Sequence, residues 1–159
     1  MNCSRTCGDF VESMGLFWES EGLPRIAGRL FGFLIVQSEP CSLDDLAAAL
    51  GVSKASISTD SRRLEQLGLI TRVGKPGDRR DYYVVDADAP ITSLELRLRG
   101  LRRAERSLDL LDLSSLPPVV QQRIQRFEHA HHRIVRALED ALAQIRSEKF
   151  PPASLSETL

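Results

Sequence analysis

The chain has 159 residues, of which 42% are hydrophobic and 27% are charged, values that are ordinary for one globular domain with an added helical segment. No apolar run approaches the roughly 18 residues that a membrane span needs, and the N-terminus lacks the apolar block of a secretory signal, so we expect a cytoplasmic protein. The net charge of −1 excludes a generally basic surface, although residues 53–80 alone hold seven basic and three acidic side chains.

Two helices are predicted at the start of the chain. Apolar residues at helical spacing predict the first over residues 9–22, and we treat residues 1–23 as an N-terminal helical arm. Pro24 begins the second helix, which runs to about Gln37 and has glycines near its apolar face. Cys3, Cys7 and Cys41 are an odd number of cysteines in a chain without a signal, which argues against a disulfide framework. Cys3 and Cys7 form a redox pair or, more simply, are reduced thiols.

The next two predicted helices are separated by a very short turn. Ser42 is placed as the N-cap of the helix "LDDLAAAL", and Gly51 supplies the left-handed residue that ends it. Ser53 caps the following helix, which continues to Gly68. Two helices joined by a three-residue turn containing glycine form a helix-turn-helix.

A β-hairpin is predicted directly after the helix-turn-helix. The strands "LITRV" and "DYYVV" flank "KPGD", where Pro76 and Gly77 occupy the second and third positions of a type II turn. A hairpin in this place is a wing. Residues 24–90 are therefore predicted to be a winged helix-turn-helix DNA-binding domain.

The rest of the chain is predicted to be helical. Residues 91–149 form a helical dimerisation region, and residues 150–159 form a disordered tail. The fold class is mainly α with a small β-hairpin wing. Apolar residues recur in the last helix at alternating steps of four and three, which is typical of a helix packed along another helix. The residues of this predicted dimer seam are Ile124, Phe127, His131, Ile134, Leu138, Ala141 and Ile145.

The stretch "SLDDLAAALGVSKASISTDSRRLEQLGLITRVGKPGDRRDYYVV" resembles the winged helix-turn-helix of the MarR superfamily of bacterial transcriptional regulators. The preceding "GLPRIAGRLFGFLIVQSEPCSL" looks most like the GbsR-type branch. The resemblance covers roughly residues 9–90. It implies a homodimer whose terminal helices form the dimer platform, and a regulator of transcription, more often a repressor, that a small ligand switches. The GbsR-type branch is associated with sensing of choline or betaine, which implies a quaternary ammonium effector.

The second helix of the helix-turn-helix has an apolar face and a polar face. Ile57, Leu64 and Leu67 are expected to pack inward, together with Ser61 or Asp60. Hydroxyls near the start of the other face are suited to phosphates and base edges, and arginines further along bind guanine in a bidentate manner. The predicted DNA contacts of this helix are Ser53, Lys54, Ser56, Ser58, Thr59, Arg62 and Arg63.

The wing concentrates positive charge at its tip. Arg79 or Arg80 is expected to enter the minor groove beside the recognition helix, and Lys75 and Arg72 are expected to meet phosphates. Phosphate repels Asp78, so we expect it to orient the wing by a hydrogen bond within the loop or by pairing with a wing arginine. The expected partner is double-stranded DNA with a palindromic operator.

Simpler interpretations exist for each feature. The cations alone would suit a solvated helix face and a polar turn, and a winged helix used only for protein–protein contact would need no basic wing. "EHAHH" (residues 128–132) has metal-like spacing but no evident fourth ligand, so we predict no metal and no cofactor. The aromatic residues that could form a cage for a cation are more simply core or interface residues: Phe10, Phe17, Trp18, Tyr82 and Tyr83. No motif of catalysis is present, so an enzyme is not predicted.

Overall fold

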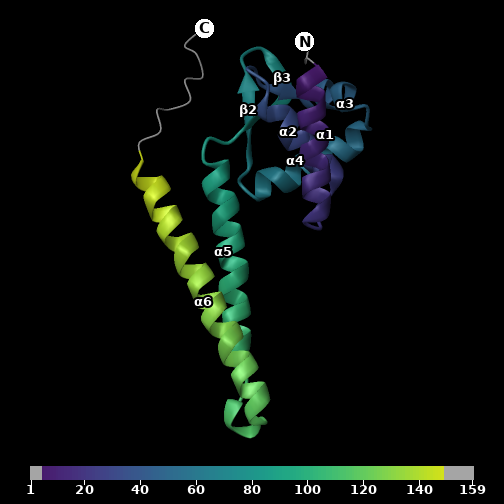
Figure 1. Cartoon of the computed structure of the whole chain (residues 1–159). Coiled ribbons are helices and arrows are strands. Elements are labelled where there is room, and N and C mark those ends of the chain that lie inside the picture. Colours follow the sequence, from purple (N-terminus) through teal and green to yellow (C-terminus); the bar gives the residue numbers. More distant parts are fainter. Residues whose placement is uncertain (1–4, 149–159) are drawn as a thin grey trace. The chain divides into compact units, whose positions relative to one another are not determined.

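The computed structural model describes residues 5–148 and divides into two compact units, residues 1–89 and 90–159. The chain is mainly helical with one small antiparallel sheet, as the sequence predicts (Figure 1). Cys3 and the predicted tail of residues 150–159 lie outside the described residues. Within the described residues, no helix is long and apolar enough to span a bilayer.

The first unit opens with two closely packed helices, α1 (Arg5–Ser20) and α2 (Arg25–Ile35). Val11 and Trp18 of α1 are buried in the same core as the winged-helix residues, so α1 is part of this unit's packing. Gly28 permits the close approach. A Cβ atom at this position would lie only 2.6 Å from the Met14 carbonyl oxygen and 2.7 Å from Trp18 Cβ.

The helix-turn-helix consists of α3 (Leu43–Leu50) and α4 (Lys54–Gln66). Ser42 caps α3 through a capping box, because its hydroxyl accepts from the Asp45 amide while the Asp45 side chain accepts from the Ser42 amide. Gly51 has φ = 66° and ends α3 in the left-handed region. The predicted caps therefore stand where the sequence places them.

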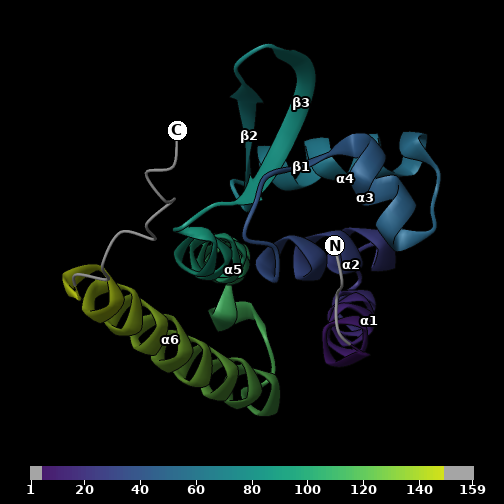
Figure 2. The same cartoon turned by 90° about the horizontal axis from the view of Figure 1, so that it is seen from above.

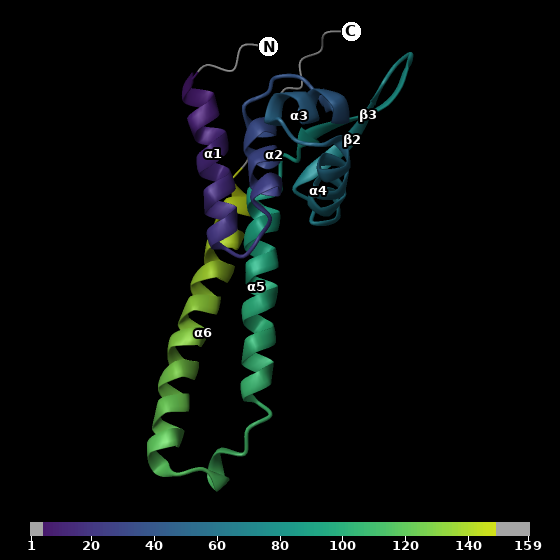
Figure 3. The same cartoon turned by 90° about the vertical axis from the view of Figure 1, so that its right-hand side faces the viewer.

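The sheet has three strands in the order β1-β3-β2, all antiparallel. The wing is the hairpin of β2 (Ile70–Lys75) and β3 (Asp78–Val85), and Gly77 at its tip has φ = 79°. The third strand, β1 (Cys41–Ser42), was not predicted and pairs with Tyr83 and Tyr82 of β3. Figure 2 shows β1 beside β3, and the hairpin extends beyond the helices of this unit (Figure 3).

The second unit is a helical hairpin of α5 (Ala89–Leu108) and α6 (Pro118–Ser147). Ala89, the first residue of α5, still belongs to the first unit. A 3-10 turn (Leu113–Ser115) lies between the two helices. Leu98 of α5 packs with Val135 and Leu142 of α6. Ion pairs reinforce the contact, joining Arg102 to Glu139 and Arg146 to Glu95.

Candidate nucleic-acid interface

Helix α4 begins with a serine cap and buries one face. The Ser53 hydroxyl accepts from the Ser56 amide at 3.2 Å, which satisfies one of the free N–H groups at the helix start. Ile57, Ser61 and Leu64 are fully buried, as expected for the inward face. Asp60 is buried as well, so both alternatives for the inward face, Ser61 and Asp60, lie in the interior. Burial raises the pKa of Asp60, and the guanidinium of Arg63 partly offsets this.

The other face of α4 carries the predicted DNA contacts at the surface. The Lys54 ammonium lies 2.7 Å from the carboxylate of Asp44 in α3. The Arg62 guanidinium donates to the Ser58 hydroxyl at 3.0 Å, and Arg63 lies 3.7 Å from Asp60. The Lys54 and Arg62 contacts are exposed and cost little to exchange for phosphate. Arg63 differs, because the Asp60 carboxylate beside it is buried.

Thr59 uses its hydroxyl within the helix. The Thr59 hydroxyl donates to the Ala55 carbonyl at 3.0 Å, one turn back in α4. Its oxygen therefore remains available as an acceptor, whereas its proton is already engaged.

Arg72 is held at the base of the wing. It lies on β2, 3.5 Å from Glu65 of α4 and 3.5 Å from Asp81 of β3. These two pairs join α4 to both strands of the hairpin. Arg72 is thus placed between α4 and the wing.

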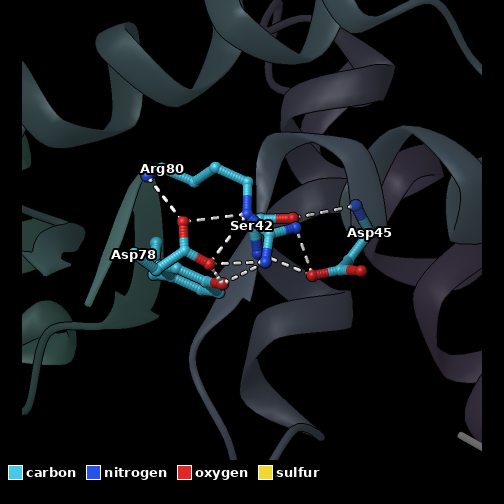
Figure 4. A network of polar contacts seen from close by, with 5 residues as sticks. Ser42, Asp45, Asp78 and Arg80 are labelled. Carbon is cyan, nitrogen blue, oxygen red and sulfur yellow. Dashed lines mark hydrogen bonds and ion pairs between the residues drawn. The ribbon is translucent and has the colours of Figure 1, made fainter. Parts of the chain in front are cut away.

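At the wing tip, Asp78 and Arg80 form a close pair. Arg80 donates from Nε to both oxygens of Asp78, at 3.1 and 2.9 Å, and from Nη2 to Oδ2 at 2.6 Å. The Arg80 amide also donates to Asp78 at 2.9 Å. Figure 4 shows the two side chains turned toward each other, with Ser42 and Asp45 beside them. This is the pairing with a wing arginine that was expected of Asp78.

The electrostatics of the pair follow from this geometry. Hydrogen bonds from the Arg80 side chain and amide hold the pKa of Asp78 well below its usual range, so the carboxylate is ionised at neutral pH. The Asp78 carboxylate in turn raises the pKa of Arg80. The Arg80 side chain remains 54% exposed, so the pair orients the charge without burying the residue.

Arg79 is placed differently from its neighbour. It is exposed, and its side chain makes no hydrogen bond or ion pair with the part of the chain that the structure describes. The two arginines expected to enter a groove therefore differ, because the Arg80 side chain is paired with Asp78 and the Arg79 side chain is not. Both are accessible from solvent.

Tyr82 belongs to this site, although it was not among the predicted DNA-binding residues. Its hydroxyl contacts both Asp78 and Arg80, and its ring lies beneath Lys75. The signal was present in the spacing, since residues 78, 80 and 82 recur at every second position of one strand and so share a face. The interpretation of Tyr82 as a core residue is correct for its burial but incomplete.

The predicted dimer seam divides between two faces of α6. His131 is buried and its Nε2–H donates to the Leu101 carbonyl at 3.0 Å, and Leu138 packs against the apolar cluster with α5. Phe127 and Ile134 instead remain 55% and 51% exposed. Part of the heptad stripe is thus used within the chain, and part faces solvent. Ile124, Ala141 and Ile145 are partly buried.

Two further expectations concern metal and aromatic residues. Among residues 5–148, no group of three or more histidine, cysteine or acidic side chains is arranged to hold a metal ion. Trp18 packs on Phe31 with ring centroids 5.5 Å apart, whereas Tyr82 lies in the wing with Lys75 and Arg80. Phe10 and Phe17 are exposed on α1. The described structure gives these aromatics no shared cage.

Comparison with known proteins agrees with this architecture. The model of the MarR family matches residues 33–82, from within α2 to the wing. The HTH-type transcriptional regulator MmpR5 of Mycobacterium tuberculosis is 35% identical over 86% of this chain and 84% of its own length. The HTH-type transcriptional repressor OpcR of Bacillus subtilis is 26% identical over 73% of this chain and 69% of its own.

A solved structure described as a transcriptional regulator is similar over almost all of its length. It is 34% identical, has a TM-score of 0.73, and covers 90% of this chain and 99% of its own. The similarity thus includes both the helix-turn-helix with its wing and the long helices that follow. The chain belongs to the MarR family of transcriptional regulators.

Proposed function

We propose that this regulator is a repressor that binds a palindromic DNA operator as a homodimer. Residues Ser53 to Arg63 lie in the major groove of each half-site, and Arg79 or Arg80 enters the adjacent minor groove. The observation that carries the proposal is that a capped helix and a projecting basic hairpin occur in one compact unit. None of the eleven side chains predicted to contact DNA is buried.

Electrostatics support the same assignment. The N-terminal end of α4 offers unpaired amides and a positive dipole end, to which Lys54 adds charge. If each subunit neutralises about four phosphates, a dimer releases roughly seven counterions, and its affinity falls steeply with added salt. A single subunit binds too weakly to select one site in a genome.

The proposed domain roles follow the chain. Residues 24–90 contact DNA, and residues 91–149 pair with a second copy. The exposed Phe127 and Ile134 of α6 support this pairing, because large apolar side chains seven residues apart favour burial against another helix. The partly buried Ile124, Ala141 and Ile145 complete the proposed contact.

The finer family placement rests on sequence resemblance. We place the chain in the GbsR-type branch on the resemblance of residues Gly22 to Leu43. Membership of that branch implies a quaternary ammonium effector. The aromatic residues do not gather into a cage for such an effector within the described chain.

The proposal is tested by selecting bound sequences from a pool of random duplex DNA, with and without choline or betaine. We expect one enriched palindrome whose half-sites are about one helical turn apart. Arg62→Ala should relax the base preference at one position in each half-site, and Arg63→Ala serves as the comparison on the same helix. Retention of protein–DNA complexes without any enriched sequence would refute the proposal.

A further inference from the structure

Tyr82 is fixed in the middle of the sheet. It lies on β3 opposite Ser42 of β1 on one side and Val73 of β2 on the other, and it is only 5% exposed. Ser42 is also the N-cap of α3. The backbone of Tyr82 is therefore held between the wing and the start of the helix-turn-helix.

The hydroxyl of Tyr82 closes a ring of hydrogen bonds with the two charged residues at the wing tip. It donates to Asp78 Oδ2 at 2.7 Å and accepts from Arg80 Nη2 at 2.7 Å. Arg80 in turn donates to Asp78. We call Asp78, Arg80 and Tyr82 the wing clamp.

The wing clamp leaves one end of the guanidinium available. Arginine has five N–H donors, and here the Nε and Nη2 side is bonded to Asp78 and Tyr82. The Nη1 group makes no hydrogen bond with the described part of the chain. Arg80 thus has one side committed to orientation and one side open to a ligand.

The aromatic ring of Tyr82 holds a second cation. Lys75 Nζ lies 4.4 Å from the ring centroid, and Arg80 Cζ lies 5.4 Å from it. Both distances are within the range of cation–π attraction. One buried side chain therefore contacts two of the four cations assigned to the wing. The Asp78 carboxylate raises the pKa of Tyr82, so the phenol keeps its proton at neutral pH and remains a donor.

We propose that Tyr82 is a positioning residue for DNA binding, which fixes the Arg80 guanidinium and the Lys75 ammonium before DNA arrives. The proposal rests on the proposed function and assigns to that site a residue that does not itself reach DNA. An arginine already held in one orientation loses less side-chain freedom on binding, so the clamp strengthens the complex without adding a charge.

The test compares Tyr82→Phe with Tyr83→Phe. Tyr83 is the adjacent buried tyrosine, and its hydroxyl makes no hydrogen bond with the described residues, so it controls for loss of a phenol. The probe is the duplex that the wild type enriches from a random pool. For a dimer with two wings, we expect Tyr82→Phe to weaken binding about tenfold and Tyr83→Phe to leave it near the wild-type value.

Three further readouts separate positioning from a general structural role. The salt dependence of the affinity should be the same for Tyr82→Phe and the wild type, because no charge is removed. In an Arg80→Ala background, Tyr82→Phe should have little further effect. In the protein without DNA, the Arg80 Nε–H should exchange with water faster in Tyr82→Phe, as measured by NMR.

Equal affinity of Tyr82→Phe and the wild type would overturn the proposal, and so would an undiminished effect in the Arg80→Ala background. If the wild type bound no duplex at all, the proposed function itself would be refuted, and the role of Tyr82 on DNA with it.

Discussion

Gly28 permits the close contact between α1 and α2, so we expect Gly28→Ala to destabilise the first unit. The added Cβ would lie 2.6 Å from the Met14 carbonyl oxygen, 2.7 Å from Trp18 Cβ and 2.8 Å from Trp18 Cγ. Backbone and the base of a tryptophan side chain cannot rotate away, so the two helices must separate.

Two opposing effects set the magnitude. Overpacking a core costs typically about 1–3 kcal/mol, and contacts this short with rigid atoms favour the upper end. Replacing glycine by alanine within a helix gains up to about 1 kcal/mol. We therefore expect a net loss of about 1–2 kcal/mol in the free energy of unfolding.

The assay is urea unfolding followed by the fluorescence of Trp18, the only tryptophan in the chain, which lies at the substituted contact. Gly8→Ala is the matched control, because Gly8 lies in α1 and a Cβ there meets no atom within 4 Å. We expect this control to be neutral or slightly stabilising. A Gly28→Ala protein as stable as the control would refute the close packing of α1 on α2.

Two other perturbations test the wing and the long helices. Asp78→Asn should destabilise the protein at neutral pH, because the folded state lowers the pKa of Asp78 and so gains stability above the unfolded pKa of about 3.9. This stability is lost as the pH falls toward the folded pKa, so the difference between variant and wild type in urea unfolding should shrink below about pH 4. A difference in stability that does not change with pH would contradict the ion pair. Ile134→Glu should give monomers by sedimentation with unchanged helical content, whereas Gln125→Glu, also exposed on α6, should remain dimeric, and a dimeric Ile134→Glu protein would exclude this face from the proposed dimer contact.

Local sequence signals were sufficient to predict the helix-turn-helix and its wing. Ser42 and Ser53 are N-caps, and Gly51 is a left-handed C-cap. Each acts on backbone groups within four positions of itself. The turn at Gly77 is likewise decided locally. Such signals can be read directly because the partner of each group is close in the sequence.

Features that depend on distant partners were not predicted. The strand β1 has two residues, too few for a periodic pattern, and exists because it pairs with Tyr82 and Tyr83 about 40 residues later. The heptad stripe of α6 indicated a helix partner but not which partner. Val135 and Leu138 pack against α5, whereas Ile134, next to Val135 in the sequence, remains exposed. A repeat along one helix cannot distinguish contact within the chain from contact between copies.

The central claim is that α4 and the wing together bind DNA, and the salt dependence of affinity for the selected duplex tests it most directly. We predict a logarithmic slope of roughly −7 for the wild-type dimer. Arg79→Ala should make the slope shallower by about one to two, because one free cation is removed from each subunit. Affinity that is insensitive to salt, or an Arg79→Ala and Arg80→Ala double variant with the wild-type affinity and slope, would contradict the account.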